Sequence, residues 1–340
     1  MNTSTAPLPP ALSGQRFTVQ ARAGRVEGYC AGPRQQPAPD APGAQGAPGA
    51  PGATRAPVFS QPAGVAPDAW PDQASRPPLL LVHSINASAS AAEMLPLFEH
   101  AGSRRSVYAP DLPGYGGSDR SDRDYSPRLM TDALHDLLDH IGQHHGSAPV
   151  DALALSLGCE FLARAAVEAP TRFRRLAFVS PTGFNGRARR FGPDGGSVGP
   201  PWALKLLKGP GKGWGAALFR GLTRPGVIRY FLERTWGSKN IDEALWRYDV
   251  LTTRQPGAHF APLHFLSARL FSSDINTLYE KLEHPVWVSH GTRGDFTDYR
   301  GLKTVLNKPN WHVTAYPNTG ALMYFEQPAT FNADLDRFLA

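Results

Sequence analysis

The residue best suited to covalent chemistry is Ser156, which follows the apolar run Val150–Leu155 and precedes a segment with helical periodicity. A sharp strand-to-helix turn forces the serine backbone into a sparsely populated conformation, so its neighbours at two residues' distance must be small. Ala154 and Gly158 meet that condition. The pattern predicts an exposed nucleophile, with the Leu157 N–H placed to hold a developing oxyanion.

The segments that must position Ser156 alternate between short apolar runs and amphipathic helices. Continuous apolar runs of this length are typical of strands buried on both faces of a parallel sheet. We therefore expect an α/β fold with a mostly parallel, doubly wound sheet, preceded by a hairpin. The hairpin is expected at residues 14–32, the strands at 79–82, 107–109, 150–155, 176–179, 286–289 and 313–316, and two of the helices at 127–143 and 328–339.

Two segments interrupt this alternation. Residues 33–77 are rich in Ala, Pro, Gly and Gln, a composition that predicts a flexible insertion without a core. Residues 183–283 have no clear strand pattern and are helical in places, so we expect a helical cap over the carboxyl edge of the sheet. The expected division is N-terminal strands at 1–32, the insertion at 33–77, the core at 78–182 and 284–340, and the cap at 183–283.

Three segments together resemble the α/β-hydrolase superfamily. They are Leu81–Asn86, which stands where the family has a strand and oxyanion loop, the loop Asp111–Asp119, and the turn at Ser156. The resemblance covers about residues 78–182 and 284–340. It implies an α/β-hydrolase fold with a helical cap and Ser156 as the nucleophile.

The resemblance also implies the partners of that serine. The backbone N–H groups of Ile85 and Leu157 would be the oxyanion donors, with Ser84 in place of the usual glycine. The acid of the triad would be Asp295, just past the strand at 286–289, and Asp298 is the second choice.

The family's usual base is missing. Family members often show Gly-His-x-x-x-x-Glu-x-Pro after the last strand, and counting back from Glu326 and Pro328 places Ala321 at the histidine position. His312 lies at the far end of its strand, about 16 Å away at ~3.3 Å per residue. The remaining weak candidates for the base are His290, His83, His259 and His264.

Composition argues against several other classes of protein, among them disulfide-rich, metal-binding and membrane-spanning proteins. The chain has 340 residues, a formal net charge of +6 and 2 cysteines, which form neither a disulfide framework nor a metal-binding spacing. No apolar run reaches the roughly 18 residues of a membrane span, and no secretory signal is recognisable, so we expect a cytoplasmic protein. No phosphate-binding glycine loop is visible, and we expect no cofactor, no metal and no nucleic-acid partner.

One stretch of the expected cap is strongly basic. Between Arg187 and Lys239 the acidic residues are Asp194 and Glu233 alone, while tryptophans interleave with the cations. This composition fits contact with an anionic substrate or a lipid surface, or a solvated basic face above an apolar stripe. The cations are Arg187, Arg189, Arg190, Lys205, Lys208, Lys212, Arg220, Arg224, Arg229, Arg234 and Lys239.

Three functional hypotheses remain from the sequence. The first is a serine hydrolase of ester or other acyl bonds in a hydrophobic or anionic small molecule, with an atypical or incomplete triad. The second, suggested by Ala321, keeps the fold for ligand binding or for lyase or cyclase chemistry. The third is a peripheral lipid-surface protein that uses the basic cap.

Overall fold

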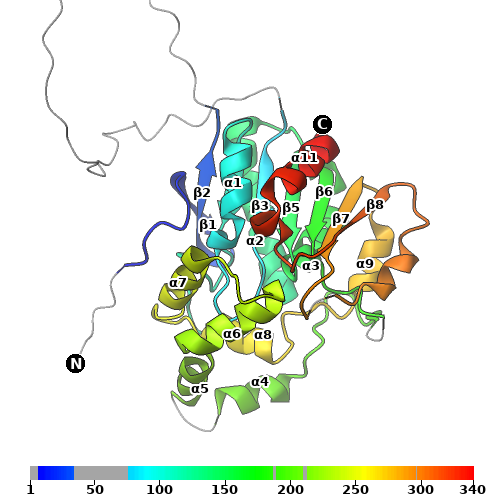
Figure 1. Ribbon diagram of the computed structural model, residues 1–340. Coiled ribbons are helices and arrows are strands. Elements are labelled where there is room, and N and C mark those ends of the chain that lie inside the picture. Colours follow the sequence, from blue (N-terminus) through cyan, green and yellow to red (C-terminus); the bar gives the residue numbers. More distant parts are fainter. Residues whose placement is uncertain (1–6, 34–75, 187–188, 210–212, 296) are drawn as a thin grey trace, which may run out of the picture.

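The centre of the molecule is a mixed, mostly parallel sheet (Figure 1). A computed structural model describes residues 7–33, 76–186, 189–209, 213–295 and 297–340. Within them the strands are β1 (Gln15–Ala21), β2 (Gly24–Ala31), β3 (Leu79–Val82), β4 (Val107–Pro110), β5 (Val150–Leu155), β6 (Phe173–Val179), β7 (Val286–Gly291) and β8 (Trp311–Tyr316). Their order in the sheet is β1-β2-β4-β3-β5-β6-β7-β8, in which β1 and β2 form an antiparallel hairpin and β3 to β8 run parallel. The predicted fold class and all predicted strands are confirmed.

Helices cover both faces of the sheet and bury a separate core on each (Figure 1). One face is covered by α2 (Pro127–His145), α3 (Gly158–Glu168) and α9 (Ile275–Lys281). The other is covered by α1 (Leu95–Gly102), α10 (Met323–Glu326) and α11 (Pro328–Leu339). Strands between two apolar layers must be apolar on both sides, which explains why β3, β4 and β5 are buried at every residue.

The segment between β6 and β7, residues 183–283, is here called the helical insertion. Its helices in the described residues are α4 (Pro201–Lys208), α5 (Trp214–Leu222), α6 (Pro225–Trp236), α7 (Glu243–Thr252), α8 (Phe260–Leu266) and α9. In Figure 1, α4 to α8 lie below one end of the sheet, whereas α9 returns to the sheet face beside α3. The helical insertion therefore lies beside the strand edge through α4 to α8, and its last helix, α9, joins the core on one face of the sheet.

The prediction of a flexible insertion at residues 33–77 falls on residues 34–75, which lie outside the described residues. The strands on either side of that segment, β2 and β3, are both paired with β4. Ala31 at the end of β2 and Leu79 at the start of β3 both pair with Val107, the first residue of β4. Both ends of the segment therefore leave the sheet at the edge where the parallel strands begin.

The structure also contains elements that the periodicity did not predict. They include α1, α10 and the 3-10 turn η1 (Ala91–Met94), all short helices without a full amphipathic pattern. Of the helices in the described residues, none is long and apolar enough to cross a membrane.

Candidate active site

Ser156 occupies a strained turn between β5 and α3. Its φ is 53°, in the left-handed region that residues with a side chain seldom adopt. The Ser156 N–H donates to the Val179 carbonyl at 2.8 Å, and its own carbonyl accepts from the Cys159 N–H at 3.2 Å. These bonds fix the backbone from both sides, so the strain is held by the sheet and the helix together. The side chain is half-buried rather than enclosed.

The small neighbours of Ser156 have a clear steric cause. A Cβ on Gly158 would lie 2.4 Å from the carbonyl oxygen of His83, at the end of the adjacent strand. Ala154 is fully buried, and its carbonyl accepts a bond from the thiol of Cys159 at 3.2 Å. The turn can form only because these two positions carry little or no side chain.

The two N–H groups expected as oxyanion donors lie on separate elements. Leu157 is the first residue after Ser156, and Ile85 belongs to the loop that follows β3. Among the described residues, neither N–H donates a hydrogen bond to a backbone or side-chain acceptor. Val82 pairs with Ala154, so the loop that holds Ile85 leaves the sheet next to the turn at Ser156. Buried backbone donors normally find a partner, so two unengaged N–H groups on these neighbouring loops fit an anion-stabilising site.

A buried carboxylate holds the loop that contains Ile85. Glu93 accepts from the Ser84 N–H at 2.8 Å, from the Ser84 hydroxyl at 2.8 Å and from the Asn86 amide at 2.9 Å. The side chain of Ser84, which stands where the family usually has glycine, thus anchors the loop to Glu93.

Sequence reasoning missed this role of Glu93. The spacing Ser90-x-x-Glu93 resembles a capping box, in which the glutamate would return to its own helix N-terminus. Its carboxylate reaches back to Ser84 instead.

A second buried acid lies close to this loop. Asp249, on α7, is fully buried, and its Oδ1 has no hydrogen-bond partner among the described residues. Burial raises the pKa of Asp249 well above its usual value, and the nearby charge of Glu93 raises it further. Burial likewise raises the pKa of Glu93, although the hydrogen bonds from Ser84 and Asn86 oppose that rise.

His83 is fully engaged in structure. Its Nε2 accepts from the Leu112 N–H at 2.8 Å, so the ring proton is on Nδ1, which faces the Ser84 carbonyl at 2.5 Å. With both nitrogens used and the ring buried, His83 joins the loop after β3 to the loop after β4. It has no free lone pair to accept a proton from Ser156.

The two histidines of the helical insertion are also occupied by packing. His264 is buried, its Nδ1 faces the Phe260 carbonyl at 2.9 Å, and its Nε2 lies 3.4 Å from Asp124. His259 packs against the ring of Phe260, with ring centres 4.0 Å apart. Burial lowers the pKa of both imidazoles.

His290 lies at the same edge of the sheet as Ser156. It ends β7 with its Nδ1 3.0 Å from the Gly291 carbonyl, and its ring stacks on Tyr299 with centres 4.2 Å apart. A carbonyl only accepts, so Nδ1 carries the proton and Nε2 is left as a free acceptor among the described residues. Burial raises the pKa of Tyr299, which keeps its phenol neutral.

The register of the sheet sets the distance between His290 and Ser156. Leu155 pairs with Val179, and Val179 pairs with Ser289. Ser156 and His290 each follow one of these residues, so they stand at the same level two strands apart, roughly 10 Å between backbones. In the described residues, no histidine hydrogen-bonds the Ser156 hydroxyl.

The two carboxylates expected as the acid are paired with arginines. Asp295 forms an ion pair with Arg234, which projects from α6. Asp298 accepts two bonds from Arg300 at 2.8 Å, and that guanidinium holds the pKa of Asp298 well below its usual value. The structure therefore brings neither carboxylate to a histidine.

The loop at Ala321, where the sequence resemblance implied a histidine, is covered by the end of α6. The Ala321 N–H donates to the Thr235 carbonyl at 3.0 Å, and the Ala321 carbonyl accepts from the Ser180 hydroxyl at 2.8 Å. A Cβ on Gly320 would lie 2.5 Å from the Cα of Trp236. The helical insertion thus packs directly on the loop where the family has its base.

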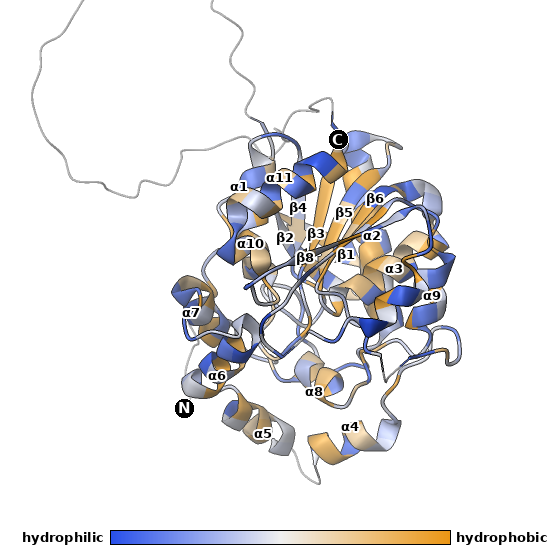
Figure 2. Cartoon of the chain, turned by 45° about the vertical axis from the view of Figure 1, so that its right-hand side comes forward, coloured by the Kyte–Doolittle hydropathy of each residue, from blue (hydrophilic) through white to orange (hydrophobic). Residues whose placement is uncertain are grey.

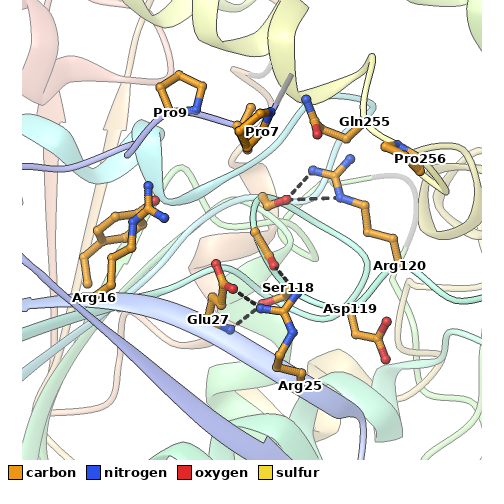
Figure 3. Close-up of a pocket in the computed structure, with 14 residues that line it drawn as sticks. Pro7, Pro9, Arg16, Arg25, Glu27, Ser118, Asp119, Arg120, Gln255 and Pro256 are labelled. Atoms are coloured by element: carbon orange, nitrogen blue, oxygen red, sulfur yellow. Dashed lines mark hydrogen bonds and ion pairs between the residues drawn. The ribbon is translucent and has the colours of Figure 1, made fainter. Parts of the chain in front are cut away.

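The structure also has two surface clefts among the described residues that do not include Ser156. One, of about 360 Å³, is bounded by the β1–β2 hairpin, the loop after β4 and the end of α7 (Figure 3). Figure 3 shows Arg120 reaching the Gly116 carbonyl, while Arg25 pairs with Glu27. The other, of about 450 Å³, lies at the Arg234–Asp295 pair. Ser156 lines neither cleft.

Comparison with known proteins agrees with this architecture. Residues 77–207 match the family described as alpha/beta hydrolase fold. No curated protein matches the chain.

Several solved structures are similar over nearly the whole chain. A probable hydrolytic enzyme from Pseudomonas aeruginosa PAO1 is 16% identical with a TM-score of 0.66, covering 99% of this chain and 100% of that chain. A meta-cleavage product hydrolase from Pseudomonas fluorescens IP01 is 14% identical with a TM-score of 0.60, covering 95% and 96%. A carboxylesterase from Bacillus subtilis is 17% identical with a TM-score of 0.61, covering 98% and 93%. At these identities the likeness shows a common fold and no substrate.

Proposed function

We propose that this chain, which has the α/β-hydrolase fold and whose residues 77–207 match that family, is a serine hydrolase of carboxylic esters or related acyl bonds in hydrophobic small molecules. The observation that carries this proposal is the left-handed backbone of Ser156, with φ 53°, beside the unengaged N–H groups of Ile85 and Leu157. A strained serine next to two free donors fits a nucleophile and its oxyanion hole.

The proposed reaction starts with attack of the Ser156 oxygen on the acyl carbonyl carbon. The carbonyl oxygen gains negative charge, which the N–H groups of Ile85 and Leu157 stabilise. The collapse of this intermediate expels the alcohol, which takes up a proton, and leaves an acyl group on Ser156. Water then attacks the acyl group and releases the carboxylic acid.

We assign the proton acceptor to His290. Its Nε2 has no partner among the described residues and is at the same edge of the sheet as Ser156, whereas His83 is engaged through both nitrogens and His259 and His264 lie on the helical insertion. The separation of two strands requires a bridging water or substrate group between Nε2 and the serine hydroxyl. General-base catalysis across such a bridge is weaker than direct contact, so we expect slow turnover.

The proposed substrate class rests on the serine and the two N–H groups, which fit attack on an acyl carbonyl. A carboxylesterase is among the similar structures, so an aryl ester is the first substrate to test.

The test combines active-site labelling with ester hydrolysis. A fluorophosphonate probe should add to Ser156 in the parent chain and fail to add to Ser156→Ala. His290→Gln should slow hydrolysis of a short aryl ester by about 10²-fold, the lower range for loss of a general base. His312→Gln is the matched control, since His312 is exposed on β8. A folded parent chain that neither labels nor hydrolyses would refute the proposal.

A second function is favoured by one observation. The end of α6 covers Ala321, and Arg234 forms an ion pair with Asp295. The residues at the positions expected for the base and the acid are therefore engaged in structural contacts. This arrangement suits a protein that binds an acyl-like ligand without cleaving it. Binding of an ester that persists uncleaved, and that survives Ser156→Ala, would favour this alternative.

A further inference from the structure

The outermost helices of the insertion expose large apolar side chains. Trp202 and Leu206 on α4 are 65% and 70% exposed, and Trp214 at the start of α5 is 57% exposed. No residue of α4 is buried. Scattered exposed apolar residues are ordinary, but two tryptophans and a leucine on two neighbouring short helices form a patch that needs an explanation.

The exposed residues share one side of the α4 helix. Trp202, Lys205 and Leu206 are three and four residues apart, so they project together. Figures 1 and 2 both show α4 and α5 at the end of the insertion farthest from α11, and Figure 2 colours α4 largely as hydrophobic. The two helices contact each other and rest on α8.

Unpaired positive charge lies on the same two helices and just after them. Residues 195–232 contain no Asp or Glu. Lys205, Arg220 and Arg224 form no ion pair with any described residue, whereas Lys208 pairs with Asp122 at 2.9 Å. Elsewhere on the described surface many arginines have a carboxylate partner, as Arg22, Arg104 and Arg128 do.

We propose that this α4–α5 surface, made of Trp202, Lys205, Leu206, Trp214, Arg220 and Arg224, docks on an anionic lipid bilayer. Tryptophan prefers the boundary between headgroups and acyl chains, and cations beside it meet lipid phosphates. Each lysine or arginine near an anionic surface strengthens binding about fivefold. A second copy of the chain would bring the same cations together, which charge repulsion opposes. The proposal does not depend on the chemistry of Ser156.

The full chain is tested by sedimentation with vesicles. It should bind vesicles of phosphatidylcholine and phosphatidylglycerol in equal parts, and should bind pure phosphatidylcholine at least about tenfold more weakly. Raising the salt from about 0.1 M to 1 M shortens the screening length from about 10 to 3 Å and should release the protein. Failure to bind, or equal binding to both vesicles, would overturn the proposal.

Variants separate the apolar and the charged contributions. Leu206→Ser with Trp202→Ser, and separately Lys205→Glu with Arg220→Glu, should each weaken binding more than tenfold. The matched control is Leu306→Ser with Lys303→Glu, which changes an exposed leucine and lysine away from the patch. Unfolding midpoints and Ser156 labelling should be unchanged in all three. A parent chain that dimerises, and becomes monomeric on Leu206→Ser, would identify the patch as a contact between copies and refute lipid docking.

Discussion

Arg234 of α6 forms an ion pair with Asp295, and the Thr235 carbonyl at the same helix end accepts a hydrogen bond from the N–H of Ala321. One turn of the helical insertion is therefore bonded to both loops that carry the acid and the base in related hydrolases. Arg293 reinforces this junction by donating to the Trp236 carbonyl at 2.9 Å and pairing with Glu326. Ala321 and Asp295, the positions where the sequence resemblance implied the base and the acid, are thus joined to the same helix end.

This arrangement predicts how a triad can be restored. Ala321→His alone should raise ester hydrolysis little, because Arg234 keeps Asp295 from orienting the new imidazole. Ala321→His with Arg234→Gln should be at least about tenfold faster than Ala321→His alone, within the range for general-base catalysis. Hydrolysis of an aryl ester followed by absorbance measures both.

Arg229→Gln is the control for that comparison, since Arg229 lies on the same helix and pairs with Glu243 instead. Equal rates of Ala321→His in all three backgrounds would show that the ion pair does not limit the acid.

The buried acids beside the oxyanion loop predict an unusual dependence of stability on pH. Burial raises the pKa of Asp249, so the folded chain keeps a proton that the unfolded chain loses. The stabilising contribution is complete below the usual carboxyl pKa and is lost as the pH rises through the raised value. Asp249→Asn should therefore be more stable than the parent at alkaline pH, with a flatter pH profile in urea unfolding.

Asp298 provides the opposite sign for comparison. Its pKa is lowered by Arg300, so its contribution is present above the usual carboxyl pKa and is lost only on acidification. Asp298→Asn should flatten the acid side of the profile and leave the alkaline side unchanged.

If Asp249→Asn instead lost stability at alkaline pH, an ionised Asp249 would have to be stabilised by its surroundings.

A third prediction concerns the packing of the turn at Ser156. Gly158→Ala would press a methyl group against the His83 carbonyl, and we expect a loss of about 1–3 kcal/mol in the free energy of unfolding together with weaker labelling of Ser156. Gly142→Ala, inside α2, has its nearest neighbour at 3.8 Å and should gain about 0.5–1 kcal/mol. Urea unfolding of both variants distinguishes a local clash from a general effect of the substitution.

A fourth prediction concerns the 2 cysteines. Cys159 is near the start of α3, where a helix N-terminus lowers a thiol pKa, yet burial raises the pKa of Cys159 well above its usual value. Burial also raises the pKa of Cys30 to about 12. Neither thiol should react with a disulfide reagent at neutral pH until urea is added, when both should. Rapid reaction of one thiol in the native chain would mean that the folded structure around that cysteine opens and exposes it to the reagent.

Much of the fold was readable because its signals are local. The apolar run before Ser156 and the small residues around it predict a buried strand and a tight turn, and β5 and φ 53° match them. The helix at 328–339 is found at Pro328–Leu339, since a proline at its first position and regular apolar spacing mark it. The assignment of Ala321 to the family's histidine position rests on the flanking Glu326 and Pro328 and stays a prediction.

The contacts that define the site were not readable because they are long-range. Arg234 is 61 residues from Asp295, and in sequence it is one cation among many in a basic stretch. Trp236 interleaves with those cations too, but it is buried against Phe325 rather than facing solvent. Asp249 has no motif at all, and only the packing of α7 on the turn η1 reveals that it lies near Glu93.

The pairing of Ala31 and Leu79 with the same residue, Val107, has a practical consequence. The two strand ends flank β4 and stand about 10 Å apart, a gap that four or five extended residues can bridge. They also lie at the edge of the sheet opposite Ser156. A short linker, an affinity tag or a fluorescent reporter placed between these two strand ends should therefore leave the chemistry at the far edge of the sheet undisturbed.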